Sequence, residues 1–339
     1  MGKFLEYCRH KDVDLTAKAY FIDALGAMAL GLFASLLIGT IFQTLGDQLG
    51  IKAFVTIASY AKQATGAAIG IAIASTLRCK GLLLYSTIAV GIAGNTLGGP
   101  LGAYIAVLVA VELGKMVYKE TPVDILVTPT VVIVSGVLVA IALGPGIDKI
   151  MTALGTFIEN ATEMRPFIMG VIVSVVIGMV LTLPISSAAI CLAIGLGGLA
   201  GGAATAGCCA QMIGFAVMSF KENRWAGLVA QGLGTSMLQM PNIVRHPQIW
   251  IPPTLAAAIT GPLSTCVFHL ENIPIGSGMG TCGLVGPIGI FTAMPDGGTM
   301  MWVGLVLVCF VIPAVLSWLF SEIMRKTGWI KAGYLNIEC

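Results

Sequence analysis

Long apolar runs separated by short polar stretches make up most of the chain. A helix that crosses the hydrocarbon core of a bilayer needs about 20 predominantly apolar residues. Five runs approach or exceed this length without a break, and they cover residues 20–45, 53–77, 122–145, 166–183 and 300–323. The pattern therefore predicts a bundle of membrane-spanning helices.

Three further apolar stretches are broken. Residues 81–117 are about twice too long for one crossing and are interrupted between Asn95 and Pro100. Residues 184–220 are interrupted by paired glycines, and residues 226–296 carry proline, glycine and polar residues with almost no charge. We therefore expect an all-α integral membrane protein with about 8–10 transmembrane helices, including broken helices and re-entrant hairpins.

The basic residues fall in four groups, which precede the first span, follow the second, occupy a short polar loop and follow the last span. They are Lys3, Arg9, Lys11 and Lys18; Arg78 and Lys80; Lys221 and Arg224; and Arg325, Lys326 and Lys331. Because Lys and Arg collect on the cytoplasmic side, we place all four groups and both termini in the cytoplasm. Residues 1–17 then form a cytoplasmic segment without a secretory signal, residues 18–325 the transmembrane domain, and residues 326–339 a cytoplasmic tail.

Residues 146–165 differ from the spanning runs because their apolar residues recur at steps of three and four. The apolar stripe comprises Ile147, Ile150, Met151, Leu154, Phe157 and Ile158. This period is typical of an amphipathic helix. One interpretation is a helix at the membrane interface, and the other is a loop helix that covers the ends of the bundle.

The composition agrees with a membrane protein and excludes several functions. Hydrophobic residues make up 57% of the chain and charged residues only 10%, against roughly 25% charged in a typical soluble domain. These values exclude a disordered scaffold and a nucleic-acid-binding protein with a basic face. No pair among the nine cysteines has the spacing of a zinc site, so we expect buried reduced thiols, no metal and no cofactor.

Two glycine-rich stretches, residues 93–102 and 269–289, combine proline and polar residues with little charge. Irregular backbone at membrane depth is tolerated only where protein covers it or where it lines a wet cavity, so both are candidate binding sites. Each holds a Gly-Pro-aliphatic-Gly unit and an upstream asparagine, which is a hint of internal repeats; a chance likeness is the alternative. We expect residues 269–290 to form a re-entrant hairpin and not a straight helix. The candidate solute ligands here are Asn95, Thr96, Asn272, Gly278 and Thr281.

Two titratable residues begin the second stretch. A carboxylate at membrane depth is costly and marks a functional site by default, so Glu271 is a candidate acceptor for sugar hydroxyls; its other interpretation is an interfacial helix cap. His269 either contacts the solute or only satisfies a backbone carbonyl. Ser186 follows a proline and an isoleucine, and its hydroxyl either caps a helix or lines a cavity. Further uncharged hydrogen-bonding residues favour a neutral polar solute over an ion, and they are Gln211, Gln231, Gln239 and Asn242.

Several phrases, taken in order, resemble a known family. They lie at residues 121–129 with Gly144-Pro145, at residues 167–170 and 183–187, and at residues 272–274 and 280–289. The chain resembles the enzyme IIC proteins of the phosphotransferase system, in the IIC-like branch that includes the membrane regulator of perfringolysin O. The resemblance covers about residues 15–325.

The resemblance implies a homodimeric sugar permease in the bacterial cytoplasmic membrane, with an elevator-like movement of its substrate domain. In the family a Glu near a hairpin tip and a His contact the sugar, and Glu271 and His269 are the matching residue types. Conventional systems phosphorylate the solute through a soluble IIB domain, for which this chain leaves no segment. Phosphoryl transfer would then need separate IIA and IIB proteins, and we expect no catalytic residue in this chain.

Two functional hypotheses follow. The first is a polytopic transporter that moves a small polar solute, a sugar or sugar-like compound, by alternating access. The alternative is a membrane-embedded sensor or regulator that binds a solute without transport. An intramembrane enzyme is disfavoured, because Ser, His and Asp are too sparse for a triad and no His-Glu-x-x-His motif occurs.

Overall fold

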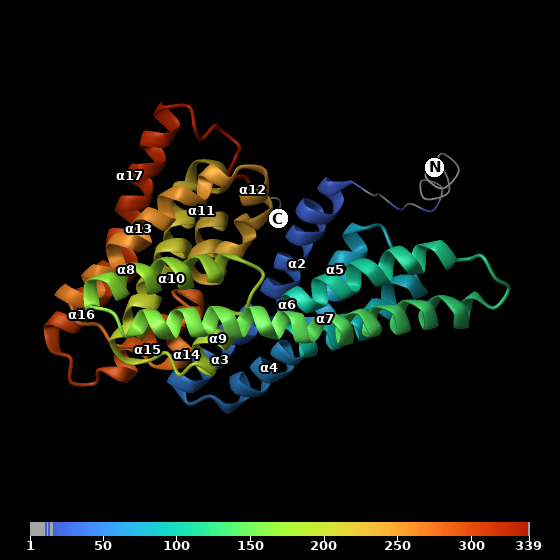
Figure 1. The fold of residues 1–339 in the computed structure, drawn as a ribbon, viewed down its shortest axis with the longest axis horizontal. Coiled ribbons are helices and arrows are strands. Elements are labelled where there is room, and N and C mark those ends of the chain that lie inside the picture. Colours follow the sequence, from blue (N-terminus) through green and yellow to red (C-terminus); the bar gives the residue numbers. More distant parts are fainter. Residues whose placement is uncertain (1–10, 12, 14–15, 338–339) are drawn as a thin grey trace. The chain divides into compact units, whose positions relative to one another are not determined.

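A computed structural model describes Lys11, Val13 and residues 16–337 (Figure 1). This part of the chain is helical and contains no strand; Gly198 and Asn272 form one isolated antiparallel bridge. The chain divides into two compact units. Unit 1 comprises Met1–Gly39 and Lys52–Ile150, and unit 2 comprises Thr40–Ile51 and Met151–Cys339.

Unit 1 is built from the first helices of the chain. They are η1 (Ala19–Ala24), α2 (Leu25–Leu32), η2 (Phe33–Leu37), the start of α3 (Ile38–Leu49), α4 (Lys52–Gln63), α5 (Thr65–Thr76), α6 (Leu82–Val117) and α7 (Asp124–Thr162) up to Ile150. Residues 53–77, predicted as one span, form two helices instead, α4 and α5, because the helix is interrupted at Ala64. There the hydroxyl of Thr65 donates to the carbonyl of Lys62 at 2.6 Å, and such local bonds compete with a continuous helix.

Helix α6 is a hairpin with a kink at its middle. Gly98 and Gly99 leave helical geometry, Gly99 with φ +61° and ψ −160°. The two halves then run side by side in opposite directions: a Cβ placed on Gly94 would lie 2.6 Å from the Cα of Ala103, and one on Gly114 would lie 2.4 Å from the side chain of Leu83. The interruption predicted between Asn95 and Pro100 is therefore confirmed.

We expect Gly99→Ala to destabilise unit 1 by about 1–3 kcal/mol, because its backbone lies in a region that is essentially restricted to glycine. No neighbouring atom lies within 4 Å of a Cβ at this position, so the cost comes from the backbone alone. Gly146→Ala is the matched control, since Gly146 is helical and also has open space around it. Thermal unfolding in detergent should show a lower midpoint for the first variant and an unchanged or higher midpoint for the second; equal midpoints would contradict the kink.

Residues 146–162 form the last part of α7, which continues through Pro145 without a break. The amphipathic helix and the span before it are therefore one helix. Whether its last turns lie at the membrane interface stays a prediction.

Unit 2 contains most of α3, the last turns of α7 and all of the later helices. Its longer helices are α8 (Pro166–Thr182), α10 (Gly198–Met218), α11 (Phe220–Val229), α13 (Ile251–Pro262), α15 (Val285–Ala293), α16 (Gly298–Val306) and α17 (Ile312–Lys326). Its short helices are α9 (Ser187–Ala193), η3 (Ala230–Gly234), η4 (Ser236–Gln239), α12 (Met240–Arg245), η5 (Pro247–Trp250), η6 (Leu263–Val267), α14 (Pro274–Ser277), η7 (Cys282–Leu284) and η8 (Leu307–Val311).

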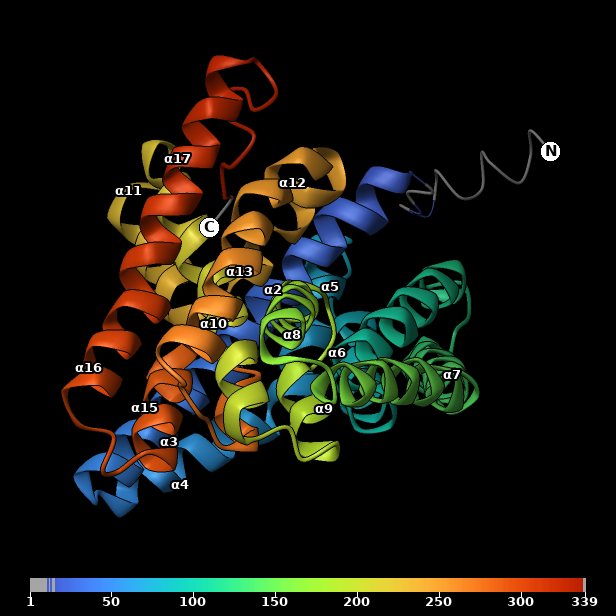
Figure 2. The ribbon, with the colours of Figure 1, turned by 60° about the vertical axis from the view of Figure 1, so that its left-hand side comes forward.

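Helix α10 is the centre of unit 2, with α8, α13 and α17 packed along it (Figures 1 and 2). Its sequence is rich in glycine, alanine and cysteine, and small residues let helices approach closely in membrane proteins. A Cβ placed on Gly207 would lie only 1.8 Å from the carbonyl oxygen of Ser174 on α8. The tight packing leaves nearly all of α10 buried.

Five helices of the described part are long and apolar enough to cross a membrane. They are Ala19–Leu49, Leu82–Val117, Asp124–Thr162, Gly198–Met218 and Gly298–Lys326, and three shorter apolar helices are Thr65–Thr76, Pro166–Thr182 and Cys282–Ala293. The prediction of an all-α membrane protein is confirmed.

Candidate functional site

The second glycine-rich stretch folds as two short helices joined by a turn. Helix α14 begins at Pro274, where proline fits the first helical position, and α15 ends at Ala293. Between them the chain has positive φ at Gly280, Gly283 and Leu284. The two helices pack together, with a Cβ on Gly289 placed 3.2 Å from the Cα of Gly276. We call residues 274–293 the hairpin; no straight helix runs through it, and its depth in the bilayer stays a prediction.

Hydrogen bonds of Asn272 hold the start of the hairpin in place. Its buried side-chain Nδ2 donates to Thr205 Oγ1 on α10 at 2.6 Å and to the carbonyl of Gly286 at 3.0 Å. Its Oδ1 accepts from the backbone N–H of Ile273 at 2.7 Å. Its own backbone N–H donates to the carbonyl of Gly198 at 3.1 Å. The asparagine therefore joins α10, α15 and the segment before α14 at one point.

Three hydroxyl groups satisfy backbone carbonyls that the turns of this region leave free. Ser277 donates to the carbonyl of Leu196 at 2.7 Å, and Ser187 donates to that of Gly278 at 2.6 Å. Thr281 donates to the carbonyl of Gly232 in η3. Buried carbonyls need such partners because no water reaches them. Of the predicted solute ligands, Asn272, Gly278 and Thr281 thus take part in bonds within the protein, and a contact with solute stays a prediction for all three.

Glu271 and His269 are the predicted ligands of unit 2 whose side chains are exposed. Both side chains are exposed and lie on either side of buried Leu270, directly before Asn272. His269 has φ +47°, an unusual value for a residue with a Cβ. The backbone N–H of Glu271 donates to Met294 Sδ at 3.2 Å. The carboxylate is therefore held on a fixed backbone and can accept hydrogen bonds from a polar molecule.

Ser186 and the two ligands predicted in unit 1 have other surroundings. Ser186 Oγ accepts from the N–H of Ala189 at 3.3 Å and caps α9, in agreement with the capping interpretation. Asn95 is half-buried near the end of the first half of α6, and Thr96 is exposed, with its hydroxyl donating to the carbonyl of Ile92 at 2.8 Å. Asn95 and Thr96 belong to unit 1, and the other six candidates belong to unit 2.

A second polar cluster lies around Gln211, which is wholly buried on α10. Its Oε1 accepts from Trp250 Nε1 at 3.0 Å, and its Nε2 donates to Thr254 Oγ1 at 3.1 Å. Nearby, the hydroxyls of Thr182 and Ser236 bond each other at 2.8 Å. The sequence singled out Gln211 but not its partners, because a threonine or serine in an apolar helix usually bonds its own backbone.

Among the described residues, no group of three or more His, Cys, Asp or Glu side chains is arranged to hold a metal ion. The region around the hairpin instead offers one accessible carboxylate, one imidazole and several amides and hydroxyls. Such groups suit hydrogen bonding to a neutral polar molecule.

Comparison with protein families gives one finding. The family model described as "Phosphotransferase system, EIIC" matches residues 22–337. Comparisons with curated proteins and with solved structures give no match.

Proposed function

The chain belongs to the EIIC family of the phosphotransferase system and is a multi-pass membrane component of such a transport system; we propose that it binds a small polar solute, a sugar or sugar-like compound, and moves it by alternating access. The observation that carries the proposal is the exposed carboxylate of Glu271 beside Asn272, which is bonded to Thr205 of α10. A carboxylate accepts strong hydrogen bonds from hydroxyl groups. His269 is the second proposed solute contact.

The attachment of the hairpin supports the proposed movement. In transporters of this kind, one part of the protein moves largely as a rigid body around the solute. Asn272 is bonded to Thr205 of α10, and Thr281 is bonded to Gly232 of η3. Glu271 would therefore move together with the core of unit 2.

The alternative proposal is a membrane-embedded sensor that binds the solute without moving it. Contacts within unit 2 between the residues after α17 and the helices before it support this alternative, because the carbonyl of Leu335 accepts from Asn223 Nδ2 at 2.7 Å and from Gln239 Nε2 at 3.0 Å. Such contacts offer an output for a binding event. Uptake of labelled solutes into proteoliposomes separates the two: binding with uptake supports a transporter, and binding without uptake supports a sensor.

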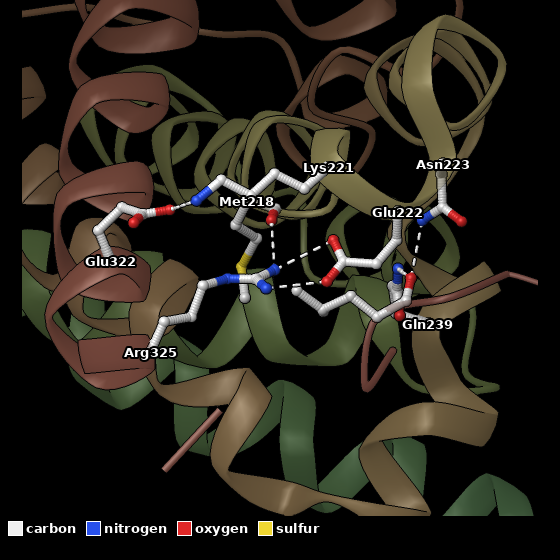
Figure 3. A network of polar contacts seen from close by, with 8 residues as sticks. Met218, Lys221, Glu222, Asn223, Gln239, Glu322 and Arg325 are labelled. Atoms are coloured by element: carbon white, nitrogen blue, oxygen red, sulfur yellow. Dashed lines mark hydrogen bonds and ion pairs between the residues drawn. The ribbon is translucent and has the colours of Figure 1, made fainter. Parts of the chain in front are cut away.

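We further propose a bacterial cytoplasmic membrane with both termini in the cytoplasm, a homodimer, and separate IIA and IIB proteins as partners. The orientation is supported by ion pairs between two of the predicted cytoplasmic groups. Lys221 pairs with Glu322, and Arg325 pairs with Glu222 at 2.8 Å (Figure 3). The proposal of separate IIA and IIB partners would gain support if phosphorylated solute formed only when soluble partner proteins are added.

We expect Glu271→Gln to weaken solute binding about 10- to 100-fold, because hydrogen bonds to a charged group contribute about 1.5–3 kcal/mol. Asp296→Asn is the control, since Asp296 is an exposed carboxylate beyond the hairpin. A panel of labelled hexoses, pentoses and polyols should be tested for binding and uptake with both variants. Unchanged affinity of Glu271→Gln for the solute that the wild type binds would contradict the assigned role.

A further inference from the structure

The described residues that follow α17 fold back onto other helices of unit 2. After α17 the backbone turns, with the N–H groups of Trp329 and Ile330 both donating to the carbonyl of Met324, at 2.9 and 3.1 Å. The following residues form turns and irregular chain and no helix. We call residues 328–337 the tail. Because this segment has few bonds within itself, its position depends on what holds it.

Side-chain amides hold the backbone of the tail. The carbonyl of Leu335 accepts from Asn223 Nδ2 and Gln239 Nε2 at 2.7 and 3.0 Å, and the carbonyl of Asn336 accepts from Asn242 Nδ2 at 2.7 Å. The N–H of Ile337 donates to Asn223 Oδ1 at 2.9 Å. Figure 3 shows Asn223 and Gln239 beside the ion pairs that join α11 to α17. These bonds recognise main chain, as in the binding of an extended peptide.

The amides are also bonded to one another. Asn242 Nδ2 donates to Gln239 Oε1 at 2.9 Å, Gln239 Nε2 donates to Gln231 Oε1 at 3.0 Å, and Gln231 Nε2 donates to Ser219 Oγ at 2.7 Å. All four residues are buried. A buried polar network in which every member has partners fixes one arrangement. The amides of Gln231, Gln239 and Asn242 are therefore set in place beside the tail. We call these three residues, together with Asn223, which bonds the tail directly, the amide cleft.

Apolar side chains of the tail fill the space beside the amide cleft. Leu335 is fully buried and Ile330 is 2% exposed, and both belong to one apolar cluster with Phe215 and Met218 of α10. Tyr334 stacks on His246, with ring centroids 3.6 Å apart and planes 7° apart. Backbone recognition and side-chain burial together are the features of a peptide-binding site.

The amide cleft is linked to the hairpin through neighbouring residues of η3. Gln231 binds Gln239, and the next residue, Gly232, accepts the hydrogen bond of Thr281 from the turn of the hairpin. A second contact runs through Trp250, which packs against the apolar cluster of the tail and donates to Gln211 of α10. The next residue of α10 is Met212, whose Sδ accepts from Thr281 Oγ1 at 3.6 Å. A change at Gln231 in the amide cleft is thus separated from the turn that follows α14 by one hydrogen bond, between Gly232 and Thr281.

We propose that the amide cleft is a peptide-binding site occupied by the chain's own tail, and that its occupancy holds the hairpin in the arrangement described above. Release of the tail frees Gln239 and Asn242, loosens η3 and removes the support of Thr281. The consequence for solute handling rests on the proposed function, whereas the coupling itself is a property of unit 2 that can be measured without any solute.

The test uses native cysteines as reporters in the purified full-length protein and in a variant that ends at Thr327. Cys282 is buried, 2% exposed, and directly follows Thr281. Cys79 of unit 1 is the control; it is 5% exposed, and burial raises the pKa of its thiol to about 12. Labelling of each cysteine by N-ethylmaleimide is followed by peptide-resolved mass spectrometry, without and with a synthetic peptide of residues 328–337.

We expect removal of the tail to speed the labelling of Cys282 at least about tenfold, because labelling follows the population of the opened state. Added peptide should restore slow labelling, whereas a peptide carrying Leu335→Asp should not, and Cys79 should stay unchanged throughout. Unchanged labelling of Cys282 in the shortened chain, or no effect of the peptide, overturns the proposal. If the shortened chain also labels faster at Cys79, the same labelling is measured on the chain that keeps its tail and carries Tyr334→Ala. Faster labelling of Cys282 with unchanged labelling of Cys79 supports the coupling, and unchanged labelling of Cys282 overturns it.

Discussion

Replacing Asn272 with leucine should unfold the hairpin region and strongly lower the free energy of unfolding of the whole protein. The substitution keeps the approximate size of the side chain but leaves the carbonyl of Gly286, the oxygen of Thr205 and the N–H of Ile273 without their bonds. Each buried group that loses its partner costs about 1–3 kcal/mol, so the sum over the three groups is roughly 3–9 kcal/mol. That is a large part of a total stability of about 5–15 kcal/mol.

Thermal unfolding of the purified variant in detergent measures this loss. Asn272→Asp separates donor from acceptor, because the carboxylate still accepts from Ile273 but no longer donates to Gly286 or Thr205; we expect it to be destabilised as well. Thr96→Ala is the control, since this exposed hydroxyl bonds only the carbonyl of Ile92 in its own helix. A melting midpoint of Asn272→Leu close to that of the wild type would show that the hydrogen bonds of Asn272 do not stabilise the hairpin.

Gly202→Ala should have an effect of similar size through a different cause. A Cβ at Gly202 would lie 1.8 Å from the carbonyl oxygen of Leu270 and 2.6 Å from its carbon. Both are backbone atoms, which cannot turn aside as a side chain does. Either α10 or the segment before the hairpin must move, and overpacking of this kind costs on the order of 3 kcal/mol.

Gly155→Ala provides the matched control in unit 2. This glycine is helical, and the nearest atom to its added Cβ is a side-chain methyl of Ile194 at 2.9 Å, which can shift. We expect Gly202→Ala to melt at a clearly lower temperature and to label faster at Cys282, while Gly155→Ala stays near the wild type. If both glycines tolerated alanine equally, close contact between α10 and Leu270 would be ruled out.

Local signals in the sequence predicted the positions where helices break. Glycine and proline act on the backbone of their own position, so the kink at Gly98 and Gly99 and the break before Pro274 could be anticipated from residue type alone. The interruption of the helix at Ala64 does not follow from the sequence in the same way, because Lys62, Gln63 and Thr65 fit within one apolar span as well as at its interruption.

The partners of the polar residues could not be anticipated in the same way. Asn272 was identified as a functional candidate from its place in a glycine-rich stretch, but its bond to Thr205 joins residues far apart in the chain. The sequence predicts that Gln231, Gln239 and Asn242 suit a polar solute, whereas the structure shows them bonded to each other, and Gln239 and Asn242 bonded to the tail. Pairings of this kind depend on the tertiary fold, which one sequence without relatives does not reveal.

The burial of α10 has a consequence for how the protein is made. Of the five long apolar helices in the described part, α10 has the lowest mean hydropathy, 1.3, and nearly all of it is buried inside the protein. A segment rich in glycine and alanine that also carries a glutamine enters lipid less readily than a leucine-rich one. During synthesis α10 would be covered on both sides only after α13 emerges from the ribosome and packs beside α8. We therefore expect the insertion machinery to retain α10 until α13 arrives.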